Sequence, residues 1–156
     1  MPNHRRLESV ELDESDRRLI DALDRNARTS TADLARLIGL SPQSTADRVK
    51  RLEDLGVLIG FTVRLDPAAL GRGIGAYIRI RPAMGELPRV AQLVADIPEI
   101  IECDRVTGED CFIAKVFVAR LDDLERVIDR LLPFAQTNTS IIQSSPVRRR
   151  QPPLTR

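Results

Sequence analysis

Two helical patterns meet at a very short turn within residues 33–63, and this feature restricts the fold more than any other. Gly39 can take the left-handed backbone conformation that ends a helix. Ser41 can cap the following helix, and Pro42 suits its first position because the N–H that proline lacks would have no partner there. Together with one earlier helical pattern, this spacing predicts a helix-turn-helix unit over residues 12–60.

The capping residues and the aliphatic residues of this unit also indicate three helices. Asp13 can cap the first helix, and Asp16 follows three residues later, as in a capping box. Ser30 or Thr31 can cap the second helix. Apolar residues recur at helical spacing, and we expect a shared core that contains Leu34, Ile38, Leu40, Val49 and Leu52.

The third helix is predicted to have a polar face. On a helical wheel Val49, Leu52 and Thr45 fall on one side, and the opposite side contains Gln43, Ser44, Asp47, Arg48 and Arg51. A recognition helix brings its N-terminal residues to base edges, where glutamine pairs with adenine and arginine with guanine, and basic residues neutralise phosphates. The expected DNA contacts are Ser41, Gln43, Ser44, Thr45, Arg48, Lys50 and Arg51.

A basic helix also has a simpler interpretation as a solvated surface. Asp47 and Arg51 could form one surface ion pair four residues apart, and Lys50 and Asp54 another. The formal net charge of the whole chain is only +1. This does not exclude nucleic-acid binding, because the local charge at the contact face decides the field there.

After Gly56 the pattern changes to that of an α+β domain. Residues 57–66 are rich in β-branched and apolar residues and predict a strand, and residues 61–73 form the linker strand and turn to a second domain at 74–147. That domain shows the order βαββαβ, which predicts a ferredoxin-like sheet with two helices. Its expected strands are 76–82, 100–107, 111–119 and 139–147, and its expected helices are 87–97 and 121–132.

Composition excludes several other classes. The chain has no apolar run of about 18 residues and no apolar stretch after its basic first residues, so neither a membrane span nor a secretory signal is expected. Cys103 and Cys111 are expected to be reduced thiols of a cytoplasmic protein. The sole histidine, His4, and two thiols make a metal site improbable.

Both ends of the chain are expected to be arms outside the two domains. Residues 1–11 contain Arg5 and Arg6, which could reach a minor groove or simply aid solubility. Residues 148–156 are basic, contain two prolines and lack periodicity, so we expect a mobile tail that could touch DNA or a partner.

The motifs of this chain closely resemble those of the Lrp/AsnC (feast/famine) family of transcriptional regulators. The first half contains "LDESDRRLI", "NARTSTADLA", "GLSPQSTADRVKRLEDLGVL" and "LDPAALG", and the second half contains "VTGEDCFIAKV" and "TNTSIIQSSPV". The resemblance covers residues 12–147 with both sets in order. It implies a DNA-binding half, a ligand-sensing half, no cofactor, and homodimers that assemble into tetramers or octamers on roughly palindromic double-stranded DNA.

The resemblance also implies an effector, often an amino acid, beside the turn between the second and third sensing-domain strands. Many relatives have an aromatic residue and then an aspartate after a Gly-acidic pair, whereas here Asp110 and Cys111 follow Glu109. We expect Asp110 to pair with an ammonium group, while backbone N–H groups and hydroxyls receive a carboxylate. Gly108 could equally serve only a tight turn, and the hydroxyls only a strand start. The predicted effector residues are Thr107, Gly108, Glu109, Asp110, Cys111, Thr137, Thr139 and Ser140.

The sequence is compatible with three functions. The first is a sequence-specific transcriptional regulator without catalytic activity that responds to a small effector. The second is a DNA-organising protein of the same family without an effector, which the altered "GEDCF" turn favours. The third is an enzyme similar to siroheme decarboxylases, which is disfavoured because His4 lies outside both expected domains and cannot supply a proton in a pocket.

Overall fold

The computed structural model describes residues 10–147 and 149–154 of the chain, and these residues divide into two compact units. The first unit contains the chain up to Val63 together with residues 149–154, and the second begins at Arg64. The expectations for His4, Arg5 and Arg6 fall on residues outside the described part. No helix in the described ranges has the length and apolar character that a membrane crossing requires.

The first unit consists of α1 (Glu14–Arg25), α2 (Thr31–Ile38) and α3 (Pro42–Asp54). Asp13 caps α1 in a capping box with Asp16, and Ser30 caps α2. Gly39 follows α2 with a φ of 75°, so the chain turns sharply into Ser41, whose side chain caps α3. These local signals were all predicted, and the helix-turn-helix that they define is confirmed.

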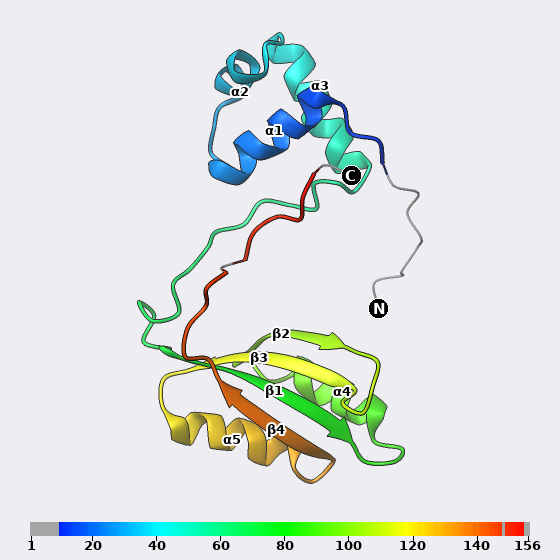
Figure 1. Cartoon of the computed structure of the whole chain (residues 1–156), viewed down its shortest axis with the longest axis vertical. Helices are drawn as coiled ribbons and strands as arrows, with labels where there is room; N and C mark the ends of the chain where they lie inside the picture. The colour runs from blue at the N-terminus through cyan, green and yellow to red at the C-terminus, as the bar shows by residue number, and fades with distance from the viewer. Residues whose placement is uncertain (1–9, 148, 155–156) are drawn as a thin grey trace. The chain divides into compact units, whose positions relative to one another are not determined.

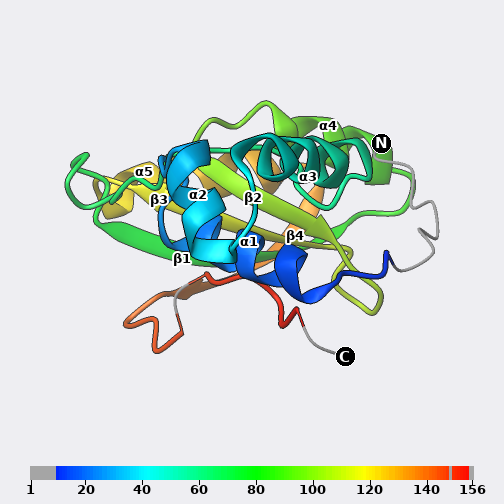
Figure 2. The ribbon, with the colours of Figure 1, turned by 90° about the horizontal axis from the view of Figure 1, so that it is seen from above.

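The core of this unit is aliphatic. Leu19, Ile20 and Leu23 of α1 meet residues from the other two helices. The three helices lie next to one another in the ribbon (Figures 1 and 2). The predicted members are present, with Leu34, Ile38 and Leu52 buried and Leu40 and Val49 partly buried.

The strand expected over residues 57–66 is absent. All ten of these residues are described, and none lies in a strand. The segment alternates apolar residues with others, but its apolar side chains Ile59, Phe61, Val63 and Leu65 are exposed. An extended segment counts as a strand only when its backbone pairs with a neighbour, and the described residues of the chain form no such ladder here.

The second unit is the predicted βαββαβ domain (Figure 1). Its sheet has the order β2-β3-β1-β4 with antiparallel neighbours, which confirms the α+β, ferredoxin-like architecture. Residues from α4, α5 and the inward sides of the strands form one core, so both helices cover the same face. The elements are β1 (Ile74–Pro82), α4 (Leu87–Ala95), β2 (Ile100–Arg105), β3 (Phe112–Val118), α5 (Leu121–Leu131) and β4 (Ala135–Ile141).

The last strand begins four residues earlier than expected. The sequence pattern placed it at 139–147, whereas β4 pairs with β1 from Ala135 opposite Pro82 to Ile141 opposite Ala76. The pairing with β1 therefore defines β4, and residues 142–147 lie outside the strand, although the N–H of Ile142 still donates to the carbonyl of Gly75 at 2.8 Å.

The tail of residues 149–154 lies against α1, so the expectation of a mobile tail is wrong for this part. Leu154 is half-buried against the core of the first unit. Its carbonyl oxygen accepts a hydrogen bond from Nε of Arg17 at 3.2 Å. The first unit is therefore completed by two segments from distant parts of the sequence.

Candidate nucleic-acid interface and sensing turn

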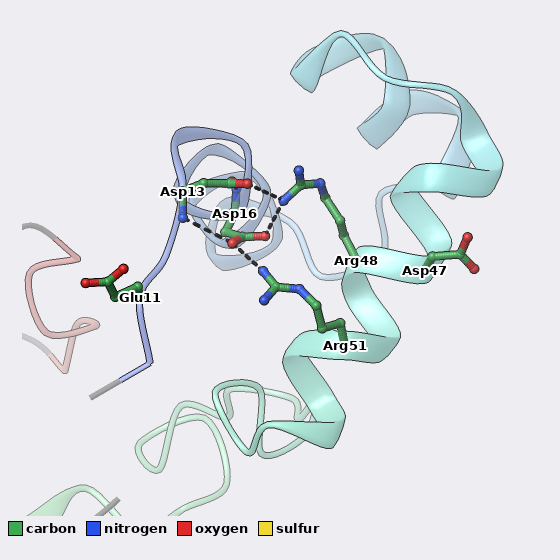
Figure 3. A pocket seen from close by; sticks show the side chains of 6 residues that line it. All are labelled: Glu11, Asp13, Asp16, Asp47, Arg48 and Arg51. Carbon is green, nitrogen blue, oxygen red and sulfur yellow. Dashed lines mark hydrogen bonds and ion pairs between the residues drawn. The ribbon is translucent and has the colours of Figure 1, made fainter. Parts of the chain in front are cut away.

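The two arginines expected to read DNA are held by α1. Arg48 donates from one guanidinium nitrogen to Asp13 at 2.7 Å and to Asp16 at 2.8 Å, and Arg51 donates to Asp16 at 2.6 Å (Figure 3). The Asp16 side chain is completely buried, whereas the side chains of Arg48 and Arg51 are 28% and 45% exposed. The sequence pattern placed both arginines on an outward face, and the structure turns both towards α1.

The opposite charges of Asp13, Asp16, Arg48 and Arg51 attract one another. The hydrogen bond from the backbone N–H of Asp16 is the main cause that holds the pKa of Asp13 below its ordinary value. Burial opposes this effect, and the guanidinium of Arg48 adds to it. Hydrogen bonds to Asp13 and Asp16 in turn raise the pKa of Arg48. The ion-pair network thus ties α3 to the start of α1 and fixes the angle between the two helices.

Asp16 is a site residue that the sequence reasoning treated only as part of a helix cap. The signal was present, because Asp16 lies three, four and seven residues before the buried Leu19, Ile20 and Leu23. A carboxylate on the apolar stripe of a helix requires a cationic partner. The sequence could not say which of the arginines would provide it.

Thr45 does not reach the surface. Its side chain is completely buried, and its hydroxyl donates to the backbone carbonyl of Ser41 at 2.9 Å. Thr45 lies four residues before Val49 and seven before Leu52, on the side of α3 that meets the core. It is therefore removed from the expected DNA contacts.

Ser41, just before α3, is exposed, and so are Gln43, Ser44, Asp47 and Lys50 within the helix. Ser41 donates its hydroxyl to Ser44 Oγ at 2.8 Å. Gln43 donates to Asp47 Oδ1 at 3.0 Å, so the expected pair of Asp47 with Arg51 is replaced. Lys50 has a 75% exposed side chain and lies 3.8 Å from Asp54, as the surface-pair interpretation expected. The outward face thus combines short hydrogen-bonding groups with one accessible lysine.

The turn between β2 and β3 presents the first part of the expected effector site. Thr107, Gly108 and Glu109 are exposed, and Asp110 is half-buried. Gly108 has a φ of 119°, a conformation that favours glycine. The turn therefore requires a glycine here whether or not Gly108 also contacts an effector. Glu109 forms an ion pair with Arg81 of β1, a partner that the sequence reasoning did not include.

The hydroxyls of β4 do not form one group. Thr137 and Thr139 are opposite Ile80 and Ile78, so they lie on the face of the sheet that the helices cover. Ser140 is opposite Tyr77 and lies on the other face. A single small molecule on one face of this sheet therefore cannot contact all three hydroxyls from the same chain.

The two thiols are free cysteines, as expected. Cys103 is opposite Ala114 in the β2–β3 register, while Cys111 lies just before β3 and its N–H donates to the carbonyl of Ile80. Burial, with a smaller contribution from Asp104, raises the pKa of Cys103. A thiol in this environment is less reactive at neutral pH than a free one.

Comparison with protein families gives two matches that do not overlap. A model described as the Lrp/AsnC ligand binding domain matches residues 75–152. A model described as a winged helix-turn-helix DNA-binding domain matches residues 12–59. The two matches correspond to the two kinds of domain described above.

Relatives and solved structures extend this similarity over most of the chain. The transcriptional regulator LrpC of Bacillus subtilis is 30% identical to this chain, over 86% of this chain and 94% of LrpC. The solved structure of LrpC matches with a TM-score of 0.83, over 87% of this chain and 97% of the LrpC chain. The regulator AldR of Mycobacterium tuberculosis is 34% identical over 85% of this chain and 78% of its own length. A feast or famine regulatory protein from M. tuberculosis complexed with L-methionine has a TM-score of 0.83 and 30% identity, with 90% of this chain and 98% of the other covered.

Proposed function

The chain belongs to the Lrp/AsnC family of helix-turn-helix transcriptional regulators, and from this premise we propose that it binds specific DNA sites and that a small effector, an amino acid, controls its binding or assembly. The observation that carries the proposal is the exposed N-terminal half of α3, which follows directly from the turn at Gly39. In a helix-turn-helix protein, the N-terminal residues of the recognition helix contact base edges in the major groove.

The side-chain contacts of α3 support different roles for its individual residues in this proposal. Gln43 and Ser44 are exposed near the start of α3, and we propose that they contact base edges and that the exposed Lys50 contacts a phosphate. Arg48 and Arg51 support the position of α3 through Asp16, although each retains partial exposure. We therefore expect their loss to weaken DNA binding mainly by loosening the helix.

Fluorescence anisotropy tests DNA binding directly. The probe is labelled DNA from upstream of the protein's own gene, compared with a scrambled duplex across a salt series. Preferential binding that falls steeply with salt is the expected result. Lys50→Gln should weaken binding to both duplexes and reduce the salt slope by about one, whereas Gln43→Ala should reduce the preference between them. Equal, weak binding of both duplexes by the parent protein would contradict sequence-specific binding at this promoter.

The sensing turn supports the effector part of the proposal. Within the described ranges, no residue forms an ion pair with the carboxylate of Asp110, which lies two residues after the turn glycine Gly108. Two solved relatives, one from M. tuberculosis and one from Neisseria meningitidis with 25% identity, carry L-methionine. These features fit a zwitterionic amino acid, whose ammonium group would meet Asp110.

A thermal-shift panel of the twenty amino acids tests for an effector. A ligand that binds only the folded protein raises the unfolding temperature by mass action. We expect at least one amino acid to do so, and Asp110→Asn to remove the shift while Asp122→Asn, an exposed change at the start of α5, retains it. A panel without any shift would favour the alternative, a DNA-organising protein of the same family.

The assembly proposed is a homodimer that associates further. The exposed apolar side chains of the linker, at alternate positions from Ile59 to Leu65, support it because an extended chain of this kind is suited to pair with a second one. Sedimentation at several concentrations tests this. Phe61→Ser should weaken self-association, whereas Leu37→Ser, which also replaces an exposed apolar residue, should not.

A further inference from the structure

Asp47 stays on the outward face of α3, whereas the two arginines that the sequence pattern placed beside it turn towards α1. Asp47 is exposed and points away from the Asp16 cluster, while Arg48 and Arg51 extend towards it (Figure 3). Within residues 10–147 and 149–154, no arginine or lysine forms an ion pair with Asp47. Its negative charge therefore lies unneutralised on the surface that would enter the groove.

Gln43 restrains this carboxylate. Its side-chain Nε2 donates to Asp47 Oδ1 at 3.0 Å across one turn of α3. A restrained side chain loses less conformational freedom on binding than a free one. The bond occupies one oxygen of Asp47 and leaves Oδ2 of Asp47 and the amide oxygen of Gln43 as acceptors.

The two acceptors, Asp47 Oδ2 and the amide oxygen of Gln43, favour a base that offers a hydrogen-bond donor in the major groove. Phosphate oxygens and the O6 and N7 atoms of guanine are acceptors, so they repel a carboxylate. Adenine offers its N6 amino group beside the N7 acceptor, whereas cytosine presents only its N4 amino group. Of the four bases, cytosine fits this pair of acceptors best.

We propose that Asp47, oriented by Gln43, is a specificity-determining residue that selects a cytosine through its N4 amino group in the major groove. The proposal rests on the proposed function, since it requires α3 to enter the groove. It assigns to Asp47 a role that the predicted DNA contacts did not include. It also explains how this helix can discriminate between bases while its arginines are engaged with α1.

Selection from a random duplex library tests the proposal with the full-length chain. The parent protein is expected to enrich a motif with one position, repeated in each half-site, where cytosine dominates. Replacing that cytosine should weaken the parent's binding about tenfold, which is within the range for a good base contact. Asp47→Asn should keep its affinity for DNA in general and move the preference at that position towards adenine, because an amide can both accept from N6 and donate to N7.

Two further variants separate base reading from charge and folding. Asp54→Asn removes an exposed carboxylate from the last turn of the same helix and should leave the motif unchanged. Gln43→Ala should weaken the cytosine preference at the same position without changing net charge. If Asp47→Asn enriches the same motif as the parent, the proposal is overturned although sequence-specific binding stands. If the parent enriches no motif, the proposed function fails and the role of Asp47 fails with it.

Discussion

The carboxylate of Asp16, completely buried near the start of α1, accepts a hydrogen bond from Arg51 of α3 at 2.6 Å. The same carboxylate accepts from Arg48 at 2.8 Å and from the backbone N–H of Asp13 at 3.2 Å. One buried acid thus receives three donors: two guanidiniums of α3, 32 and 35 residues later in the sequence, and the backbone N–H of the residue that caps α1.

Asp16→Asn should destabilise the first unit by roughly 2–4 kcal/mol, because it removes a buried charge on which two guanidiniums converge. Hydrogen–deuterium exchange of the α1 and α3 peptides, combined with urea denaturation, measures this in the full chain. The matched control is Asp21→Asn, which removes an exposed carboxylate from α1. Equal exchange in the two variants would show that the ion pairs with Asp16 do not hold α3.

Low pH should reduce the stability of the first unit, in part because Asp13 becomes protonated. The folded state lowers the pKa of Asp13, so the unfolded chain takes up the proton first as pH falls. The stabilisation is complete above the unfolded pKa of about 3.9 and is lost as pH falls through the lower folded value. The Asp13 side chain is 53% exposed, so solvent screening limits the effect to at most about 1 kcal/mol.

Thermal unfolding between pH 7 and pH 2 measures that contribution. Asp13→Asn keeps a side-chain oxygen to cap α1 but cannot form the ion pair with Arg48, so it should lose less stability than the parent protein across the acid window. Asp13→Ala should cost about 1 kcal/mol at every pH because it also removes the cap. A parent and an Asn variant with the same pH profile would contradict the assigned cause.

Gly39→Ala should destabilise the helix-turn-helix by about 1–2 kcal/mol. An added Cβ at Gly39 would meet no heavy atom within 4 Å, so the cost comes from the left-handed backbone alone. Gly39→Asn should cost less, because asparagine tolerates this conformation better than alanine. Denaturation curves of the two variants compare them directly, and similar losses would point to crowding instead of backbone strain.

Leu154→Ala should loosen α1 although it lies at the other end of the chain. The leucine is half-buried, so we expect a loss on the order of 1 kcal/mol and faster exchange of amides around Arg17. Pro153→Ala, an exposed neighbour, should change neither quantity appreciably. Unchanged exchange in the leucine variant would show that the tail contact contributes nothing in solution.

The features that the sequence predicted correctly depend on neighbours within a few residues. Asp13, Ser30 and Ser41 cap their helices because each side chain reaches a backbone N–H three residues on. Gly39 ends α2 through its own backbone freedom. These interactions are local, so the pattern around each residue is enough to predict them.

The features that were missed depend on partners far away in the sequence. The direction of Arg48 depends on Asp16, 32 residues earlier. The start of β4 depends on its register with β1, more than fifty residues before it. The expected strand at 57–66 has the right alternation but pairs with no neighbour among the residues that the structure describes. Alternation and helical spacing describe a segment by itself and do not identify what it will contact.

The contact of Leu154 with the first unit has a consequence for synthesis. A growing chain emerges from the ribosome in order, at about 5–20 residues per second. The three helices therefore appear early and wait while the whole βαββαβ domain is made before the segment that completes their packing arrives. During those seconds the surface of α1 that Leu154 later covers is open to chaperones, and a nascent chain stalled before residue 149 would still display it.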